Sequence, residues 1–457
     1  MRIMQAETRR LPGVLDLLAL HAANPRRYPY LLESAGGTGR LGRYDILCAF
    51  PGRELQLGPD GVLKGQIPGE RPTQDFLDAL DQAWTAAAPL AAELPFQGGW
   101  FVFLAYELAG RIEPSVHQAA DPWLPLARAV RIPAAVVRDR ATGRVHAVAE
   151  ADCRSLLDQI SVDAAQSTAL PESLPEVARA SLPREEDPRK FLAAVTRAKD
   201  HIAAGDIYQA NLSRRWTVEV DPDIPPWMIY GRLRQANPAP FAGLALLDDA
   251  TAIISSSPER LVRVHGGRVE TRPIAGTRPR TAMSADAGDA AVRAALLGSA
   301  KERAEHVMLI DLERSDLGRV CQPGTVRVED FMSVESYAHV HHIVSGVTGD
   351  LRHGTTPGSV LRAVFPGGTI TGCPKVRCMQ LIGELESAPR GAYTGAMGYL
   401  NHDGSCDFSI LIRTMVLNGR RLSFNAGSGI VADSDPELEL AETRAKAKGM
   451  ILALSNP

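Results

Sequence analysis

Residues 431–449, VADSDPELELAETRAKAKG, are the segment around which the rest of this chain can be organised. Asp435 is a typical N-cap residue, and Pro436 follows it at the first helical position. Because no proline or glycine follows Pro436 until Gly449, the segment predicts a helix of several turns.

Three charged side chains share one face of this predicted helix. Glu439, Glu442 and Lys446 are spaced i, i+3 and i+7. They could hold a divalent cation and a substrate carboxylate, although a solvated charged face is the commoner meaning of such spacing. A second segment, KERAEH, repeats the i, i+3 spacing with Glu302 and Glu305. Four carboxylates on two helices could close around Mg²⁺, which prefers oxygen ligands and keeps several waters.

Length and composition limit the class of protein. The chain has 457 residues and is 45% hydrophobic, enough for a large core in several domains or one large α/β unit. A net charge of −3 gives no general attraction to nucleic acid or anionic membranes. Neither a signal peptide nor a bilayer-spanning run is evident. Six cysteines without a CxxC pair favour free thiols over disulfides or zinc, so we expect a cytoplasmic protein.

Two sequence regions lie on either side of residues 163–188, which are rich in Ser, Pro, Ala and Glu and indicate a linker or surface excursion. Residues 1–165 mix short strand-like runs with glycine turns. Residues 189–450 combine helices, one expected over 289–311, with alternating strands that turn back on themselves. Without a regular strand–helix–strand rhythm, this pattern predicts an α+β fold rich in antiparallel strands.

Two glycine-rich segments could let the backbone approach a ligand. Residues 367–373 precede a helix with Pro374 expected at its first position. Such a helix start can bind anions through free N–H groups, and an ordinary capped helix is an equally good interpretation. The spacing is not that of a nucleotide-binding Walker loop. Gly427-Ser428-Gly429 is the second segment.

Polar side chains in apolar surroundings are further candidates. Arg413 is expected inside an apolar strand, SILIRTMVL, where its permanent charge needs a partner. A ligand carboxylate fits, and so does a structural salt bridge. Tyr393 could supply a hydroxyl to the same ligand. His342 is one of three neighbouring histidines, but the group lacks a convincing third metal ligand.

Several motifs occur in an order that resembles one enzyme family. ERAEH, FPGGTITGCPK, RGAYTGAMGY, IRT, GSGIVADSDPE and ELAETRAKA, all within residues 189–450, are similar to segments of the chorismate-utilising enzymes. These include the large subunits of anthranilate synthase and aminodeoxychorismate synthase, and the isochorismate and salicylate synthases. Residues 1–165, with PYLLES and GRYDIL, resemble the same subunits more loosely. The resemblance implies one intertwined, antiparallel-rich α/β sandwich of two sheets, of the anthranilate synthase component I type.

The resemblance also implies roles for individual residues. Mg²⁺ would be bound directly by Glu305 and Glu442, and through water by Glu302 and Glu439. Glu259 would be the general acid that protonates the leaving C4 hydroxyl of chorismate, which requires a raised pKa; a surface salt bridge is its alternative role. The other candidates would surround the substrate: Thr369, Tyr393, Arg413, Gly427, Ser428, Gly429 and Lys446 as binding residues, His342 near the ring, and Gln209 and Thr277 among the catalytic residues.

The residue at position 209 indicates whether water or ammonia attacks chorismate, and here it is a glutamine. Water-using members of the family resemble one another in having a lysine here to activate water, so a neutral amide favours ammonia. Residues 208–212, YQANL, resemble aminodeoxychorismate synthases more than anthranilate synthases. Asn211 in this motif is expected on the same strand face as Gln209, where its amide could help to aim ammonia at C4. Ala275, in PIAGT, points the other way, because many aminodeoxychorismate synthases have a lysine there that is implied to form a covalent intermediate. We give several motifs more weight than one position.

The predicted reaction is therefore the Mg²⁺-dependent amination of chorismate to 4-amino-4-deoxychorismate, a step toward p-aminobenzoate and folate. No glutamine amidotransferase module is visible, so a separate amidotransferase subunit is expected to supply ammonia, and neither nucleic acid nor membrane is an expected partner. One alternative is anthranilate synthase component I. Another is a non-catalytic, tryptophan-binding relative, because residues 31–34 (LLES) resemble the segment that binds tryptophan in anthranilate synthases.

Overall fold

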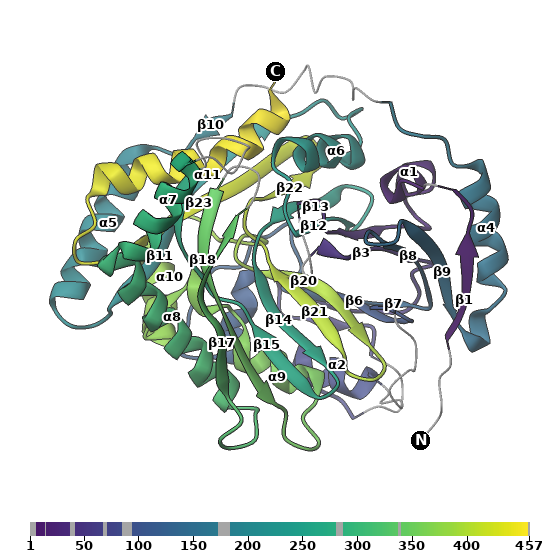
Figure 1. The fold of residues 1–457 in the computed structure, drawn as a ribbon, viewed down its shortest axis with the longest axis horizontal. Helices are drawn as coiled ribbons and strands as arrows, with labels where there is room; N and C mark the ends of the chain where they lie inside the picture. The colour runs from purple at the N-terminus through teal and green to yellow at the C-terminus, as the bar shows by residue number, and fades with distance from the viewer. Residues whose placement is uncertain are drawn as a thin grey trace.

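The computed structural model describes residues 6–13, 15–36, 42–66, 71–84, 94–171, 183–279, 287–336 and 340–455. Within them, two large sheets form the centre of the molecule, and every strand pair in both sheets is antiparallel (Figure 1). The predicted α/β sandwich with two antiparallel-rich sheets is confirmed.

The first sheet has twelve strands. Its spatial order is β1 (Ala6–Leu11), β9 (Arg144–Glu150), β8 (Ala134–Asp139), β3 (Tyr44–Ala49), β2 (Tyr30–Glu33), β12 (Phe241–Leu246), β13 (Thr251–Ser257), β22 (Thr414–Asn418), β23 (Arg421–Ile430), β11 (Gln209–Glu219) and β10 (Arg184–Glu185), with β19 (Gly372–Cys373) paired to β11.

The second sheet has eleven strands. Its order is β16 (Ile274–Pro279), β18 (Val340–Asp350), β15 (Arg268–Thr271), β14 (Arg260–His265), β21 (Cys406–Ile410), β20 (Ala396–Asn401), β6 (Gly99–Leu104), β7 (Ala127–Ile132), β4 (Glu54–Leu57) and β5 (Leu63–Lys64), with β17 (Arg327–Ser336) paired to β18.

Helices cover the outer faces of the two sheets. Figure 1 shows α5 and α11 near β11 and β23, and α4 beside β1 and β9 at the opposite end of the first sheet. No helix among the described residues is long and apolar enough to cross a bilayer. The helices are α1 (Leu17–Ala23), α2 (Phe76–Ala83), α3 (Ala109–Ile112), α4 (Leu156–Gln166), α5 (Pro188–Ala203), α6 (Pro226–Ala236), α7 (Ala287–Gly298), α8 (Ala300–Gly318), α9 (Pro357–Val364), α10 (Lys375–Leu385) and α11 (Pro436–Leu454).

Three apolar layers follow from this arrangement. One core lies between the sheets, where the rings of Tyr30 on β2 and Phe101 on β6 stack at 3.9 Å between centroids. A second core lies mainly between the second sheet and its helices and extends to β11 and β23, and a third lies between the first sheet and its helices. Strands from the first 165 residues pair with strands from the later region in both sheets, as β2 does with β12 and β6 with β20. The two sequence regions therefore share every layer of the core.

The chain passes from one sheet to the other at short connections, and two of these lie side by side. β13 continues into β14 through Pro258 and Glu259, and β21 continues into β22 through residues 411–413. Ser256 N–H donates to the carbonyl of Arg413 at 3.1 Å, and Ile410 N–H donates to that of Glu259 at 3.0 Å. The prediction that Arg413 lies inside a strand is wrong: it occupies the crossing, with φ of 50°.

Helix starts show where local sequence signals hold. Asp435 caps α11 as predicted, with its carboxylate accepting from the N–H groups of Glu437 and Leu438 at 3.0 Å. The single helix expected over 289–311 is instead two helices, because the Ser299 hydroxyl caps a new helix start at α8. Pro374 is the N-cap of α10 and not its first helical residue.

One buried ion pair connects several of these elements. Arg390, only 3% exposed, donates to Glu386 just past the end of α10, with N–O distances of 2.6 and 2.9 Å. The same guanidinium donates to the carbonyls of Asn211 on β11 (2.7 Å) and Ile370 (3.0 Å). Glu386 in turn accepts from the N–H of Ser213 at 2.7 Å. The pair thus satisfies backbone groups of a strand and a loop that would otherwise be buried without partners.

We predict that Arg390→Ala lowers the free energy of unfolding by about 3–5 kcal/mol, because it leaves the Glu386 carboxylate buried without its partner. The control is Arg189→Ala, whose side chain is 88% exposed in its pair with Asp187, so its loss should leave the free energy of unfolding nearly unchanged. Urea unfolding followed by circular dichroism measures both. Equal small losses in the two variants would contradict the prediction.

Candidate active site

The first part of the site is a stretch of β11 and β23 where two glycines leave room for polar side chains. Asn211 is the cross-strand partner of Gly429, and Gln209 lies two residues earlier on the same face. A Cβ atom at position 429 would lie 2.5 Å from Nε2 of Gln209, and one at position 427 would lie 2.7 Å from the hydroxyl of Tyr393. The glycines therefore allow these polar groups to lie directly against β23.

We call Gln209, Asn211 and Tyr393, together with Gly427 and Gly429, the polar cluster. Oδ1 of Asn211 would be only 2.9 Å from a Cβ at position 427, so it lies near the Tyr393 hydroxyl. The sequence predicts that Asn211 lies beside Gln209, because residues two apart on a strand share one face, and the structure places both on β11.

Helices α8 and α11 each bring a charged residue to this cluster. Glu305 on α8 accepts a hydrogen bond from Nε2 of Gln209 at 3.1 Å. Lys446 on α11 donates to the carbonyl of Gly427 at 3.0 Å and pairs with Glu442 at 2.7 Å. The structure thus brings together Gln209, Glu305, Gly427 and Lys446, four of the candidate residues named from the sequence.

The second part of the site is the carboxyl group of Glu259 at the sheet crossing. It is 5% exposed and accepts a hydrogen bond from the hydroxyl of Thr369 at 2.6 Å. Burial raises the pKa of Glu259 to about 7, although the Thr369 bond and the charges of Lys446 and Arg413 act to lower it. The surface salt bridge that we considered for Glu259 is absent from the described residues, since the carboxyl group is buried and its bond is to a hydroxyl.

His342 lies within reach of the same cations. Burial and the charges of Arg413 and Lys446 lower the pKa of His342 to about 3, so the ring is neutral at physiological pH. Its Nδ1 lies 3.3 Å from the carbonyl oxygen of Gly276. Because a carbonyl only accepts, Nδ1 carries the proton in that bond and Nε2 is the acceptor nitrogen.

The four carboxylates expected to bind Mg²⁺ are arranged in two separate pairs. Glu302 and Glu305 lie on α8, and Glu302 comes within 2.8 Å of where a Cβ of Gly276 would be. Glu439 on α11 accepts from the hydroxyl of Ser434 at 2.7 Å, and Glu442 is paired to Lys446. No group of three or more His, Cys, Asp or Glu residues in the described part of the chain is placed to hold a metal ion. The donor chemistry of the four carboxylates suits a hard cation, and Mg²⁺ stays a prediction.

Three other positions that the sequence analysis named have no side chain that the structure places at the polar cluster. Ser428 faces away from the polar cluster, because it alternates with the two glycines on β23, so only its backbone borders the cluster. Thr277 pairs with His342 through the backbone of β16, and its side chain lies outside the described residues. Ala275 on β16 is buried opposite Ile343.

One buried acid next to the site was not predicted. Glu313 on α8 lies beneath Gly368, and burial together with the nearby Asp316 raises the pKa of Glu313 to about 8. Lys375 donates to Asp316 at 2.5 Å, which connects α8 to the start of α10. In the sequence Glu313 is one of many helix glutamates, so no local signal separates it from exposed ones.

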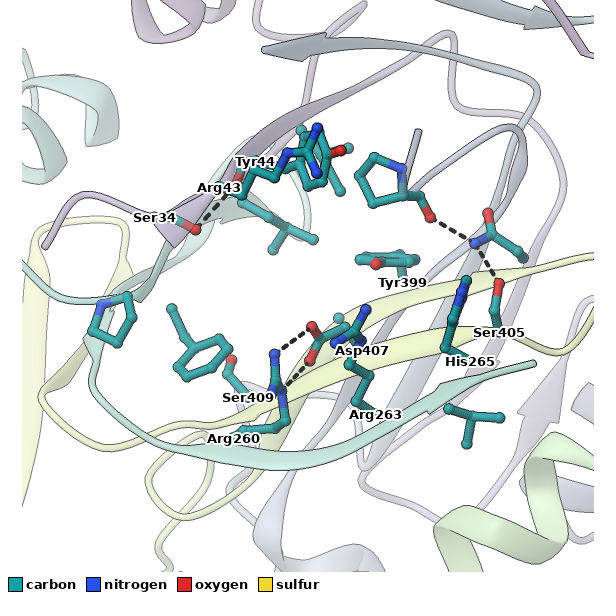
Figure 2. A pocket seen from close by; sticks show the side chains of 18 of the residues that line it. Ser34, Arg43, Tyr44, Arg260, Arg263, His265, Tyr399, Ser405, Asp407 and Ser409 are labelled. Carbon is teal, nitrogen blue, oxygen red and sulfur yellow. Dashed lines mark hydrogen bonds and ion pairs between the residues drawn. The ribbon is translucent and has the colours of Figure 1, made fainter. Parts of the chain in front are cut away.

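A cavity of about 580 Å³ lies elsewhere in the molecule and shares no lining residue with the polar cluster. Figure 2 shows Ser34 and Tyr44 on one wall and Arg260 on the other. Arg260 is held by Asp407, with N–O distances of 2.9 and 3.0 Å. Arg260 directly follows Glu259 in the chain, so the cavity lies next to the sheet crossing.

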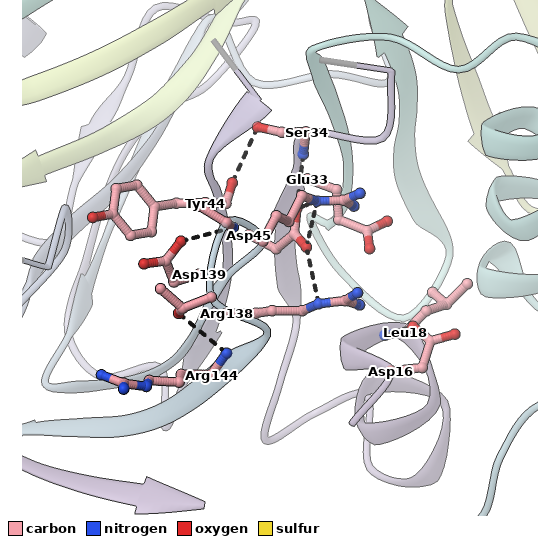
Figure 3. Close-up of polar contacts among 12 residues, drawn as sticks. Asp16, Leu18, Glu33, Ser34, Tyr44, Asp45, Arg138, Asp139 and Arg144 are labelled. Carbon is pink, nitrogen blue, oxygen red and sulfur yellow. Dashed lines mark hydrogen bonds and ion pairs between the residues drawn. The ribbon is translucent and has the colours of Figure 1, made fainter. Parts of the chain in front are cut away.

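The LLES segment forms part of this cavity. Leu32, Glu33 and Ser34 line it. Figure 3 shows how the end of the segment is fixed: the N–H of Ser34 donates to Asp45 at 2.9 Å, and the hydroxyl of Ser34 donates to the carbonyl of Tyr44 at 3.1 Å.

We predict that Glu259→Gln stabilises the protein at pH 8 but not at pH 5. The ordinary pKa of 4.5 applies in the unfolded chain, whereas the folded value is about 7. The unfolded chain therefore loses this proton first, and the free energy of unfolding falls as the pH rises from 4.5 to 7, by about 3 kcal/mol. A neutral amide removes that loss. Urea unfolding at both pH values measures it, with exposed Glu437→Gln as the matched control; identical pH dependence in both variants would contradict the raised pKa.

Comparison with known proteins identifies the family. The sequence profile of the chorismate binding enzymes matches residues 29–452. Anthranilate synthase component 1 of Aquifex aeolicus is 38% identical over 94% of this chain and 89% of that protein. Aminodeoxychorismate synthase of Streptomyces griseus is 38% identical over 94% of this chain but only 61% of that longer protein. The crystal structure of anthranilate synthase component I from Streptococcus pneumoniae superposes with a TM-score of 0.79 at 33% identity, over 91% of this chain and 93% of that one. The chain belongs to the family of chorismate binding enzymes.

Proposed function

We propose that this enzyme aminates chorismate with ammonia, giving 4-amino-4-deoxychorismate and water. The observation that carries the proposal is the buried carboxyl group of Glu259, with its pKa raised to about 7, beside two cationic side chains. Hydroxide is a poor leaving group, so replacing a hydroxyl requires an acid that still holds its proton near neutral pH. Arg413 and Lys446 carry the positive charge that two substrate carboxylates need.

The remaining residues of the site fit roles around such a substrate. Tyr393 and Thr369 offer hydroxyl groups, and neutral His342 offers an acceptor nitrogen. Thr369 also orients Glu259 through their hydrogen bond, so that the acid proton is presented on the other carboxyl oxygen. Mg²⁺, held by Glu305 and Glu442 with Glu302 and Glu439 around it, would neutralise carboxylate charge when bound.

The proposed nucleophile is ammonia because Gln209 is a neutral amide. A lysine at this position could act as a base toward water, whereas an amide cannot. Ala275 excludes a covalent intermediate on that residue. We therefore propose direct amination without an adduct at position 275, with ammonia supplied by a separate glutamine amidotransferase subunit.

Anthranilate synthesis is the second candidate, and two observations favour it. Most of the similar curated proteins are named anthranilate synthase component 1, and Ala275 is the residue usual in that branch. The cavity lined by Leu32, Glu33 and Ser34 would serve a tryptophan-binding function in this branch. The YQANL motif and the environment of Gln209 support the 4-amino product.

Product identity is the decisive prediction. Incubation with chorismate, Mg²⁺ and ammonium should give p-aminobenzoate only when an aminodeoxychorismate lyase is added, because the 4-amino product retains its pyruvyl group. Absorbance and chromatography measure it. Glu259→Gln is the matched control and should give no product with or without lyase.

The second candidate would be supported instead by fluorescent anthranilate that forms without lyase. Loss of that signal on adding tryptophan would further assign the cavity to feedback binding. If no turnover is found under any of these conditions, the remaining interpretation is a non-catalytic, tryptophan-binding protein. Calorimetry with tryptophan alone would measure that binding.

The metal site gives a separate prediction. Glu305→Ala and Glu442→Ala should each lower turnover at least about a hundredfold, because each removes a charged ligand from a site that binds Mg²⁺ weakly through few protein groups. Assays across a range of Mg²⁺ concentrations, with circular dichroism to show that the variants are folded, measure this. Glu437→Ala, on the exposed first turn of α11, is the control and should keep full activity. Near-normal rates at low Mg²⁺ in either ligand variant would show that the assignment is wrong.

A further inference from the structure

The polar cluster contains two hydrogen-bond acceptors that no described residue satisfies. Oε1 of Gln209 and Oδ1 of Asn211 are both buried, and neither accepts a hydrogen bond within the described part of the chain. Gln209 as a whole is only 2% exposed. Leaving a buried acceptor unpaired costs free energy, so two such atoms on residues that share one strand face point to a donor molecule bound at this place.

The orientation of the Gln209 amide is set by its neighbour. Nε2 donates to Glu305 at 3.1 Å, so Oε1 is the end that remains for a ligand. Asn211 is held through its backbone, since its carbonyl accepts from Arg390 at 2.7 Å. Both amides therefore have anchored positions on β11, and their oxygen atoms lie on the same face as Gly427 and Gly429.

The cluster also adjoins the proposed acid. The hydroxyl of Tyr393 and Oδ1 of Asn211 are both within 3 Å of the point that a Cβ of Gly427 would occupy. Burial is the main cause that raises the pKa of Tyr393, and the nearby carboxylates of Glu386 and Glu259 add to it. A molecule bound at the two amide oxygens would thus face the same substrate that Glu259 protonates.

We propose that Gln209 Oε1 and Asn211 Oδ1 form the binding site for free ammonia. This assignment rests on the proposed amination of chorismate. Ammonia can donate two hydrogens to the amide oxygens and keep its lone pair for the substrate. Neutral acceptors suit this purpose, because a carboxylate would stabilise ammonium, which has no lone pair. The carboxylate of Glu305 accepts from Nε2, at the other end of the Gln209 amide from Oε1. A lysine or an apolar residue at either position would offer no acceptor.

The chemistry balances without an oxidant or reductant. Nitrogen of the bound ammonia forms the new C4–N bond, and the C4–O bond breaks. The leaving oxygen takes the proton of Glu259 and departs as water. The added nitrogen loses one proton, which can return to the Glu259 carboxylate, so the acid is restored for the next cycle.

The test separates the Michaelis constant for ammonia from that for chorismate. Asn211→Leu keeps side-chain size but removes the acceptor, and it should raise the KM for ammonia about tenfold while changing the KM for chorismate less than twofold. Asn425→Leu is the matched control: Asn425 is a buried amide on the same strand pair, but its oxygen already accepts from Arg215 at 3.3 Å. It should leave both constants within twofold. Thermal unfolding shows whether each variant folds, and Asn211→Ala replaces the leucine variant if that one does not.

A second measurement needs no variant. In the unmodified enzyme, the KM calculated as free ammonia should stay constant with pH. At pH values below the ammonium pKa, the KM calculated as total ammonium should fall about tenfold for each unit by which the pH rises. A KM constant in total ammonium would overturn the proposal, as would an Asn211→Leu variant that is altered only toward chorismate or toward neither substrate. Product analysis tests the proposed function separately, so anthranilate formation with an intact ammonia effect would reject the 4-amino assignment and keep the ammonia site.

Discussion

The buried pair of Arg390 and Glu386 is the interaction on which the active-site half of this fold depends. The guanidinium and the carboxylate form hydrogen bonds to the backbone of β11, to the backbone just before β19 and to each other. Arg390 also lies over the ring of Tyr393, 5.6 Å from its centroid. A side chain that cannot lose its charge thus fixes the backbone of Asn211 and the position of Tyr393 at once.

The acid at the sheet crossing shows a second constraint. The carbonyl of Glu259 is bound by Ile410 and its side chain by Thr369, so the residue is held at both ends. Burial and the two cations act on its pKa in opposite directions, and burial is the larger effect. The outcome is an acid that holds its proton near neutral pH, beside positive charges that can bind anions. Such a group lowers folding stability above its unfolded pKa, which is a common feature of sites arranged for reaction.

The sequence predicted elements well where the signal was local. Asp435 caps α11 because a cap depends on residues two and three positions away. Arg413 was misplaced in a strand because the passage from one sheet to the other depends on strands that are distant in sequence. The same limit applies to the carboxylates: Glu302 and Glu439 lie on the expected helices, but the distance between helices is a tertiary quantity. The resemblance to a known family supplied the candidates that no local pattern distinguishes, such as Glu259.

The sharing of both sheets by early and late segments has a consequence for synthesis of the chain. Phe101 on β6 pairs with Tyr399 on β20, about 300 residues later. At about 5–20 residues per second, β6 would wait on the order of 15–60 s for its partner to leave the ribosome. During that time β7 can pair with one edge of β6, but the other edge of its apolar run, GWFVFL, stays unpaired. Yield of the folded enzyme in cells should therefore depend on chaperones that bind this segment, and the N-terminal region made alone should aggregate.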